Sequence, residues 1–217
     1  MKKDELIEIA SQLKLPTGEK GIEMGNMMHE TNITMTHNAI QNLNIVNENK
    51  ILELGHGNAR HLEYLLKKAD NLKYYGLEMS ELMFQEAQHI NRNSIAKQHA
   101  YFFLYDGNEI PFQEFFFDTI FTVNTIYFWK NPEKMLLEIY RVLKVKGIFC
   151  LTFSQESFMK QLPFTKYEFE LYNTEKAKNL IERTLFKIKY SETLKEKIKS
   201  KTGELIDRIF TTIVLEK

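Results

Sequence analysis

The sequence predicts an α/β protein with a doubly wound sheet of seven strands, mostly parallel with one reversed strand, and helices on both faces. Three observations predict it. From residue 50 onward, short apolar runs alternate with amphipathic helical stretches at least four times, which is the pattern of a parallel sheet. Glycine or polar residues follow these runs, where ligand-binding loops lie in such sheets. Near the end, two strand-like stretches are joined so closely that they must pair antiparallel.

Residues 1–44 are expected to form a helical cap beside the sheet. Residues 1–14 carry apolar side chains at helical spacing, so they predict an amphipathic helix. Glycine punctuates residues 16–25, and the next helix is expected over residues 34–43. The apolar side chains of the first helix are Leu6, Ile9, Ala10 and Leu13.

Residues 45–155 are expected to hold the alternating core. Ser80 and Asn131 precede helical stretches as N-caps, and Pro132 takes the first helical position, which suits proline. Gly147 is a typical helix stop. The expected strands are residues 51–54, 72–77, 101–105, 118–123 and 148–153. The expected helices are residues 59–69, 81–91 and 132–147.

Residues 156–217 are expected to form the substrate-side segment of one domain that includes the whole chain. Residues 158–172 are aromatic and suit a lid or a pocket wall. The Lys-rich run over residues 187–201 alternates with apolar and acidic residues, which is typical of a solvated strand face. The expected elements are a helix over residues 175–185 and strands over residues 186–195 and 205–215, joined around residues 201–203.

The composition disfavours several kinds of binding partner and metal site. Lys plus Arg and Asp plus Glu both number 29, so the zero net charge disfavours a nucleic-acid partner or an anionic membrane surface. The uncharged stretch over residues 119–129 is too short to span a bilayer. The single cysteine, Cys150, excludes a cysteine-rich zinc site, and no metal is expected. Residues 1–5 lead into no apolar signal segment, so we expect a cytoplasmic protein. The expected oligomeric state is a monomer or a homodimer.

A glycine-rich turn follows the first expected strand. Glycine lets the backbone turn tightly and approach a ligand closely. A tight strand-to-helix turn without a ligand explains the same pattern, so both interpretations stand for this motif alone. The turn consists of Gly55, His56, Gly57 and Asn58, and Glu53 lies just before it.

Acidic residues follow the second and third expected strands. Glu78 lies about twenty residues after the glycines, which is the spacing of a carboxylate that binds ribose hydroxyls in nucleotide-binding folds. Together with the glycine turn, this spacing favours a nucleoside site over a solvent-facing glutamate. Asp106 could accept a hydrogen bond from an exocyclic amine, although Asp106–Gly107 is also a common turn pair.

Asn124 and several aromatic residues follow the fourth expected strand. Tyr127 and Trp129 are candidate walls of a substrate pocket. For Phe128, packing against the neighbouring helix is an equal alternative.

In this order, the four sites resemble those of the class I S-adenosylmethionine-dependent methyltransferases, over residues 45–155. Residues 117–132 and 138–147 carry the most specific match and resemble the ubiquinone-biosynthesis-like branch. The family usually has glycine where Ala59 stands and a small residue where His56 stands. The resemblance implies a Rossmann-like fold, the cofactor S-adenosyl-L-methionine and the product S-adenosyl-L-homocysteine.

The resemblance also implies which residues form the site. Residues 16–32 resemble a cap that closes over the methionine end of the cofactor in bacterial relatives. The expected cofactor-binding residues are Glu53, Gly55, His56, Gly57, Asn58, Glu78, Met79, Asp106, Gly107, Asn124, Met28 and Asn32. The expected substrate-pocket residues are His29, Tyr127 and Trp129, and no catalytic residue is assigned.

Two other functions compete with methyl transfer. An NAD(P)-dependent oxidoreductase needs glycine or alanine at the sixth position of its fingerprint, where this chain has Arg60. A methyltransferase fold that only binds partners is compatible with His56 and Ala59. The acceptor is expected to be a small molecule, since the turn at Asn124 lacks both prolines of the Asn-Pro-Pro-Tyr loop of nucleic-acid amino methyltransferases.

Overall fold

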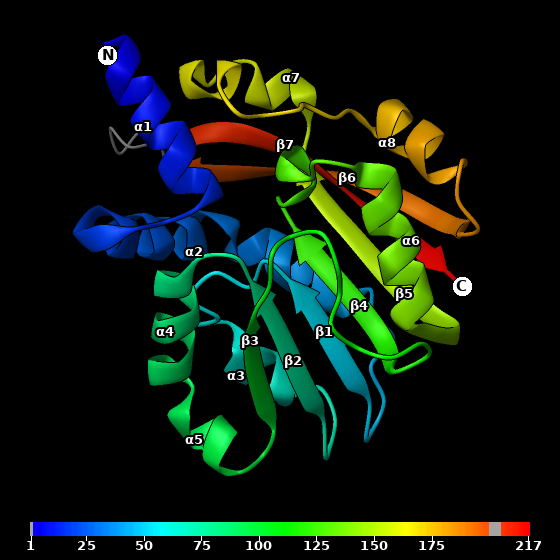
Figure 1. The fold of residues 1–217 in the computed structure, drawn as a ribbon. Coiled ribbons are helices and arrows are strands. Elements are labelled where there is room, and N and C mark those ends of the chain that lie inside the picture. The colour runs from blue at the N-terminus through cyan, green and yellow to red at the C-terminus, as the bar shows by residue number, and fades with distance from the viewer. Residues whose placement is uncertain (1, 200–204) are drawn as a thin grey trace.

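The computed structural model describes residues 2–199 and 205–217, which contain a seven-stranded sheet of order β3-β2-β1-β4-β5-β7-β6 (Figure 1). The ladders from β3 to β5 are parallel, whereas β7 runs antiparallel to both of its neighbours, β5 and β6. The predicted sheet with one reversed strand is therefore confirmed. The strands are β1 Lys50–Leu54, β2 Lys73–Glu78, β3 Ala100–Leu104, β4 Phe117–Val123, β5 Leu143–Ser154, β6 Lys187–Lys199 and β7 Leu205–Glu216.

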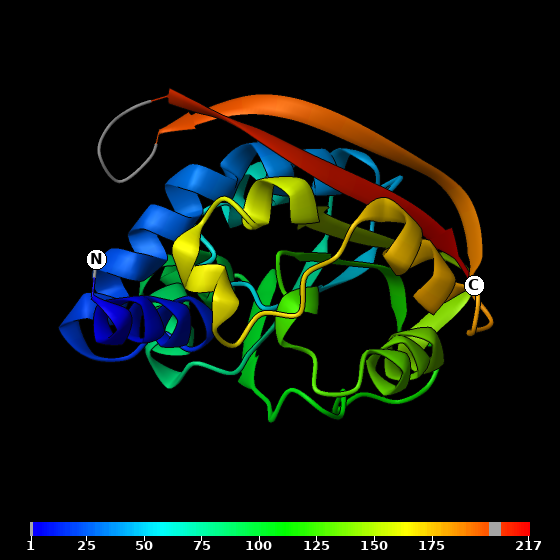
Figure 2. The ribbon, with the colours of Figure 1, turned by 90° about the horizontal axis from the view of Figure 1, so that it is seen from above.

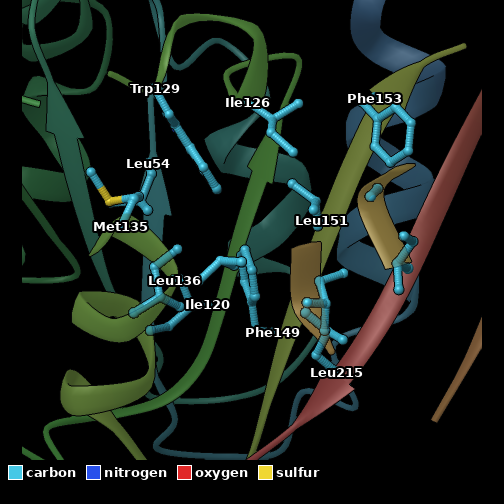
Figure 3. Packing of buried hydrophobic residues seen from close by; sticks show 14 of the residues in the cluster. Leu54, Ile120, Ile126, Trp129, Met135, Leu136, Phe149, Leu151, Phe153 and Leu215 are labelled. Atoms are coloured by element: carbon cyan, nitrogen blue, oxygen red, sulfur yellow. The ribbon is translucent and has the colours of Figure 1, made fainter. Parts of the chain in front are cut away.

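Helices cover both faces of this sheet. On one face, α6 and α8 pack on the apolar side chains of the sheet shown in Figure 3, such as Ile120, Phe149 and Leu151. On the other face, α2, α3 and α4 pack on residues such as Ile51 and Phe121. The helices are α1 Lys3–Lys14, α2 Gly18–Gln41, α3 Leu62–Leu66, α4 Glu81–Ile90, α5 Arg92–Ala96, α6 Pro132–Val142, α7 Glu156–Met159 and α8 Thr174–Ile181, with short 3-10 turns η1 Ile126–Phe128 and η2 Pro163–Lys166.

The glycine-punctuated segment is helical, so the predicted start of the second helix at residue 34 was wrong. α2 already begins at Gly18. A Cβ atom at Gly21 would lie 2.6 Å from Leu82 Cδ2, and one at Gly25 would lie 2.6 Å from Met83 Sδ. These glycines therefore let α2 lie directly against α4, instead of breaking the helix.

Three predicted helix ends were also wrong. The helix after β1 is only α3, because Ala59 has a left-handed φ of 48° and the chain coils into α3 three residues later. α6 ends at Val142, since Leu143 is buried and pairs with Phe117 at the start of β5. α8 ends at Ile181, before the predicted residue 185. The predicted turn at residues 201–203 lies outside the described residues.

The predicted N-caps are confirmed. Ser80 Oγ accepts a hydrogen bond from the Met83 N–H, and Asn131 Oδ1 accepts one from the Lys134 N–H. Each cap satisfies an N–H group that has no partner within its helix. These caps fix the starts of α4 and α6, which follow the carboxyl ends of β2 and β4.

The long β6–β7 hairpin arches along one side of the molecule toward the end where α1 and α2 lie (Figure 2). It is tied to α2 by side-chain hydrogen bonds, including Asn38 Nδ2 to Glu192 Oε1 at 2.8 Å and Thr212 Oγ1 to Asn38 Oδ1 at 2.6 Å. The hairpin thus contributes side chains to the same region as the N-terminal helices. Within the described residues, no helix has the length and apolar character needed to cross a membrane.

Candidate functional site

Three cavities lie side by side at the carboxyl edge of β1, β2 and β4. We call them the central cavity (about 130 Å³), the edge cavity (about 70 Å³) and the aromatic cavity (about 200 Å³). Gly55, Glu78 and Phe128 line both the central and the edge cavity. Met28 and Asn124 line both the central and the aromatic cavity. All predicted site residues line at least one of the three.

The glycine turn forms one wall of the central cavity. Gly55 and Gly57 have φ values of 72° and 55°, in the left-handed region that favours glycine. A Cβ atom at Gly55 would lie 2.5 Å from Thr125 Cγ2, whereas nothing lies within 4 Å of such an atom at Gly57. Gly55 is therefore required by packing, and Gly57 leaves open space next to the backbone.

Glu78, at the end of β2, holds the glycine turn in place. Its Oε2 atom accepts a hydrogen bond from the Gly57 N–H at 2.9 Å. Its Oε1 atom accepts from the N–H groups of Met79 and Ser80 at 2.8 and 3.0 Å. The side chain is 7% exposed but lines the central and edge cavities. The carboxylate is thus fixed at the junction of these two cavities, not free in solvent.

A buried polar triad lies below the glycine turn, and two of its members were not predicted. Glu53 Oε2 bonds with His61 Nε2 at 2.7 Å and with the Tyr74 hydroxyl at 2.5 Å. Burial and the neighbouring Glu53 carboxylate raise the pKa of Tyr74 well above its usual value. Glu53 and His61 both line the central cavity. A charged residue inside an otherwise apolar strand was the sequence signal that buried partners had to exist.

His56 lines the central cavity with a buried ring. Its Nδ1 lies 2.7 Å from the Gly57 carbonyl oxygen, so Nδ1 carries the proton and donates it. Nε2 is buried and makes no hydrogen bond within the described residues. Burial lowers the pKa of His56, so the ring is neutral near pH 7. Asn58 beside it donates to Asn26 Oδ1 at 3.3 Å, which links the turn to α2.

The edge cavity lies beyond β2 and β3. Asp106 Oδ1 accepts from the N–H groups of Asn108 and Glu109, so Asp106 forms the turn that was the alternative interpretation, while it also lines the cavity. Met79 packs against Gly107. Trp129 lines this cavity and not the aromatic one, and its buried Nε1 has no hydrogen-bond partner among the described residues.

Asn124 joins the central cavity to the aromatic cavity. Its φ of 58° turns the chain sharply after β4. Its Nδ2 donates to Asn32 Oδ1 at 3.1 Å, and its Oδ1 accepts from the Tyr127 hydroxyl at 2.9 Å and the Ser154 N–H at 3.0 Å. Burial raises the pKa of Tyr127. His29 lines only the central cavity, where burial lowers its pKa.

The sequence predicted only some of the residues that line the aromatic cavity. Residues 158–172 were expected to form a lid or a pocket wall, and five of them line this cavity, namely Phe158, Met159, Leu162, Phe164 and Phe169. The residues that sequence reasoning missed include Met27, Thr31, Ser154, Ile198, Ile206 and Arg208. They come from α2, β5 and the β6–β7 hairpin, and no sequence motif connects these elements.

Comparisons with known proteins agree with this geometry. Residues 52–151 match the family described as "Methyltransferase domain". An uncharacterised methyltransferase of Bacillus subtilis, YdaC, is 27% identical over 131 residues, which are 59% of this chain and 68% of the relative. The chloroplastic 2-methyl-6-phytyl-1,4-hydroquinone methyltransferase 1 of Oryza sativa subsp. japonica is 26% identical over 102 residues, which are 47% of this chain and 30% of the relative.

A solved structure shows the same fold over nearly the whole chain. It is the complex between the Haloferax volcanii Trm112 methyltransferase activator and a putative methyltransferase, with a TM-score of 0.73 and 14% identity. The match covers 98% of this chain and 99% of that one. The family match, the relatives and the shared fold agree with the motifs, and together they support a class I S-adenosylmethionine-dependent methyltransferase.

Proposed function

We propose that this protein transfers a methyl group from S-adenosyl-L-methionine to a small-molecule acceptor. The cofactor would lie across the central and edge cavities, and the acceptor would lie in the aromatic cavity. The observation that carries this proposal is the junction of a polar, glycine-lined cavity with an apolar one at Asn124 and Met28. Such a junction suits a ligand that must meet a second molecule at one end.

The residues present fit this cofactor. Gly57 leaves open space beside a backbone in the left-handed conformation. Glu78 presents a fixed carboxylate to both cavities, and a carboxylate can accept hydrogen bonds from both ribose hydroxyls. Trp129 offers a buried N–H without a protein partner among the described residues, in the cavity that Asp106 also lines.

We assign roles to the side chains on this basis. Gly55, Gly57 and Asn58 would hold the amino-acid end with Met28 and Asn32, Glu78 the ribose, and Met79, Asp106 and Gly107 the base. When bound, the cofactor supplies an electrophilic methyl group on a positively charged sulfur. The chain's own contribution is to position the acceptor atom near that methyl group, since positioning alone lowers the barrier of a bimolecular step by several kcal/mol.

Several observations support a small acceptor. The aromatic cavity is about 200 Å³ in volume and is lined mostly by apolar side chains. Its walls come from α1, α2, the segment around η2 and the β6–β7 hairpin, which lie together on one side (Figure 2). The hydroquinone methyltransferase named above supports the same acceptor class. We further propose that residues 1–217 act as one methyltransferase domain, with residues 1–44 as cap, 45–155 as cofactor core and 156–217 as acceptor side.

Thermal unfolding with three ligands tests the proposal. The protein is heated with S-adenosylmethionine, with S-adenosylhomocysteine and with NAD, each at about 100 times the dissociation constant expected for a cofactor. A bound ligand at that excess adds about 2.7 kcal/mol of stability, which raises Tm by about 5 to 10 °C for a chain of this size. We expect the shift with both sulfur compounds and none with NAD. A shift with NAD alone would favour the oxidoreductase instead.

A further inference from the structure

The aromatic cavity contains one charged side chain among the described residues that line it. Arg208, on β7, is 3% exposed and lines this cavity. Within the described part of the chain, no Asp, Glu, His or Lys side chain shares that wall. A buried arginine in an apolar cavity is costly unless it is paired, so its partners decide what the cavity can bind.

The Arg208 guanidinium is hydrogen-bonded to residues that line the cavity and to one that does not. Its Nε and Nη2 atoms both donate to Glu196 Oε1, at 3.0 and 2.7 Å, and Nη1 donates to Asn32 Oδ1 at 2.9 Å. Asn32 lines the cavity, whereas Glu196 does not. The ion pair therefore forms a dipole with the guanidinium nearer to the bound molecule. A hydrogen bond from Nη2 to the Thr31 carbonyl oxygen at 2.5 Å also holds it there.

Further hydrogen-bond donors lie where the aromatic and central cavities meet. Asn32 lines both cavities, and its Oδ1 accepts from Arg208 Nη1 and from Asn124 Nδ2. Its own amide N–H groups make no hydrogen bond within the described residues. Donors and a positive charge thus gather at the junction, next to the place proposed for the methyl group. This arrangement favours an acceptor atom that carries negative charge.

Among the described residues that line the aromatic cavity, no group suits a general base. A neutral hydroxyl or a protonated amine must lose a proton to become a nucleophile, and a base within hydrogen-bond reach normally takes it. No carboxylate or imidazole lines the aromatic cavity within the described residues, and His29 lines the central cavity only. The cavity therefore favours a nucleophile that is already deprotonated near neutral pH.

We propose that the acceptor is a small apolar acid, namely a carboxylic acid or an acidic phenol or enol, which is methylated on its oxygen anion. This proposal rests on the methyltransferase function proposed above. The acceptor oxygen forms the new bond to the methyl carbon, the carbon–sulfur bond breaks, and its electron pair goes to sulfur, which becomes a neutral thioether. No proton is transferred. Arg208 and Asn32 orient the anion, and Phe158, Phe164 and Phe169 surround the apolar body.

Three probes with the same carbon skeleton test this proposal by isothermal titration calorimetry. They are 3-phenylpropanoate, 3-phenylpropanamide and 3-phenylpropylamine, each titrated into protein saturated with S-adenosylhomocysteine. We expect the acid to bind at least tenfold more tightly than the amide or the amine. Arg208→Gln should reduce this preference below threefold, and Arg208→Lys should keep most of it. Glu196→Gln should increase it, because the neutralising carboxylate is gone.

The opposite effects of the two glutamine variants separate recognition from structural support. If Arg208 only ties β7 to α2, both variants should weaken the binding of all three probes alike. Circular dichroism and thermal unfolding show which variants are folded. Tighter or equal binding of the amine or the amide, or no binding of any probe, overturns the proposal. Absence of S-adenosylhomocysteine binding to the wild-type protein overturns the proposed function instead, so the two failures are distinguishable.

Discussion

The half of the site proposed for the cofactor and the half proposed for the acceptor are built in different ways. The cofactor half, formed by the central and edge cavities, takes its main polar groups from the ends of neighbouring strands, such as Gly55, Glu78 and Asp106. The acceptor half takes Leu13 from α1 and Arg208 from β7, at opposite ends of the chain. Sheet topology alone places the first set, because parallel strands end at one edge. The second set depends on how distant segments pack.

The two halves also differ in how their polar groups are used. In the cofactor half, Glu78 and Glu53 accept several hydrogen bonds each and fix the backbone and side chains around them. In the acceptor half, Arg208 is the one charged side chain among the described residues of a mostly apolar wall, and it is paired with Glu196 behind that wall. The first half therefore suits one polar ligand, and the second can change its specificity through a few side chains.

Removing the Glu78 carboxylate should have the largest effect. Glu78→Gln should weaken S-adenosylhomocysteine binding by about tenfold or more, and Glu78→Ala by about a hundredfold or more, since each hydrogen bond to a charged group contributes about 1.5 to 3 kcal/mol. Calorimetric titration measures both. Glu78→Ala should also lower Tm, because three backbone N–H groups lose their acceptor.

Glu81→Gln is the matched control for this prediction. Glu81 is exposed in the first turn of α4, three residues along the chain from Glu78. Its substitution removes the same charge from the same region without touching either cavity. If Glu78→Gln binds the ligand as tightly as Glu81→Gln does, Glu78 does not hold the ribose.

Comparison of Gly55→Ala with Gly18→Ala should separate the cost of a steric clash from the cost of backbone strain. In Gly55→Ala, a φ of 72° and a Cβ atom 2.5 Å from Thr125 Cγ2 should together lower the free energy of unfolding by about 2 to 4 kcal/mol. Gly18→Ala is the control, because Gly18 has a φ of 62° but nothing within 4 Å of its added Cβ. It should lose only about 1 kcal/mol. Urea unfolding measures both, and equal losses would contradict the clash at Thr125.

The buried His56 should make stability fall in mild acid. Burial lowers the pKa of His56 below its usual value in the folded chain, so below about pH 6.5 the unfolded chain takes up a proton that the folded ring does not. The free energy of unfolding should then fall with pH by up to about 1.4 kcal/mol per unit for this group. His29 and His37, whose pKa values burial also lowers, act in the same direction.

Denaturant unfolding of His56→Gln between pH 7.5 and 5.5 checks this prediction. Glutamine does not titrate, so the variant should lose less stability over that range than the wild-type protein does. Because His29 and His37 remain in both proteins, their contributions cancel in the difference. Parallel pH profiles would mean that the folded ring binds its proton as readily as the unfolded one.

The smallest expected effect is a change in tryptophan fluorescence, and it distinguishes the two halves of the site directly. Trp129 is the single tryptophan of the chain and lines the edge cavity but not the aromatic one. S-adenosylhomocysteine should therefore change tryptophan emission, whereas 3-phenylpropanoate alone should leave it nearly unchanged. Trp129→Phe gives the background signal. A larger change with the acid than with the cofactor product would place the acid in the edge cavity.

The cofactor half could be predicted from the sequence because its signals are local. Gly55, Gly57 and Glu78 follow apolar runs directly, and alternating strands and helices bring such positions to one edge. Arg60 at the sixth position of the fingerprint argues against a nicotinamide site. The partners of Glu53 were not predicted, because Tyr74 meets it only through the pairing of β1 with β2.

The acceptor half could be predicted only in part, because its contacts are long-range. Glu196 lies in the Lys-rich run that was interpreted as a solvated face, yet its side chain is only 11% exposed beneath Arg208. Gly21 and Gly25 resembled helix breakers, although they allow α2 to pack against α4. In both cases, a neighbour distant in sequence decides the environment, and local pattern contains no information about that neighbour.

A crystal structure of the complex with S-adenosylhomocysteine tests the central claim most directly. We predict one ligand molecule per chain across the central and edge cavities, with its ribose hydroxyls on the Glu78 carboxylate and its base beside Asp106 and Trp129. The aromatic cavity should remain free for the acceptor. A ligand seated in the aromatic cavity, or one whose ribose makes no contact with Glu78, would contradict this division of the site.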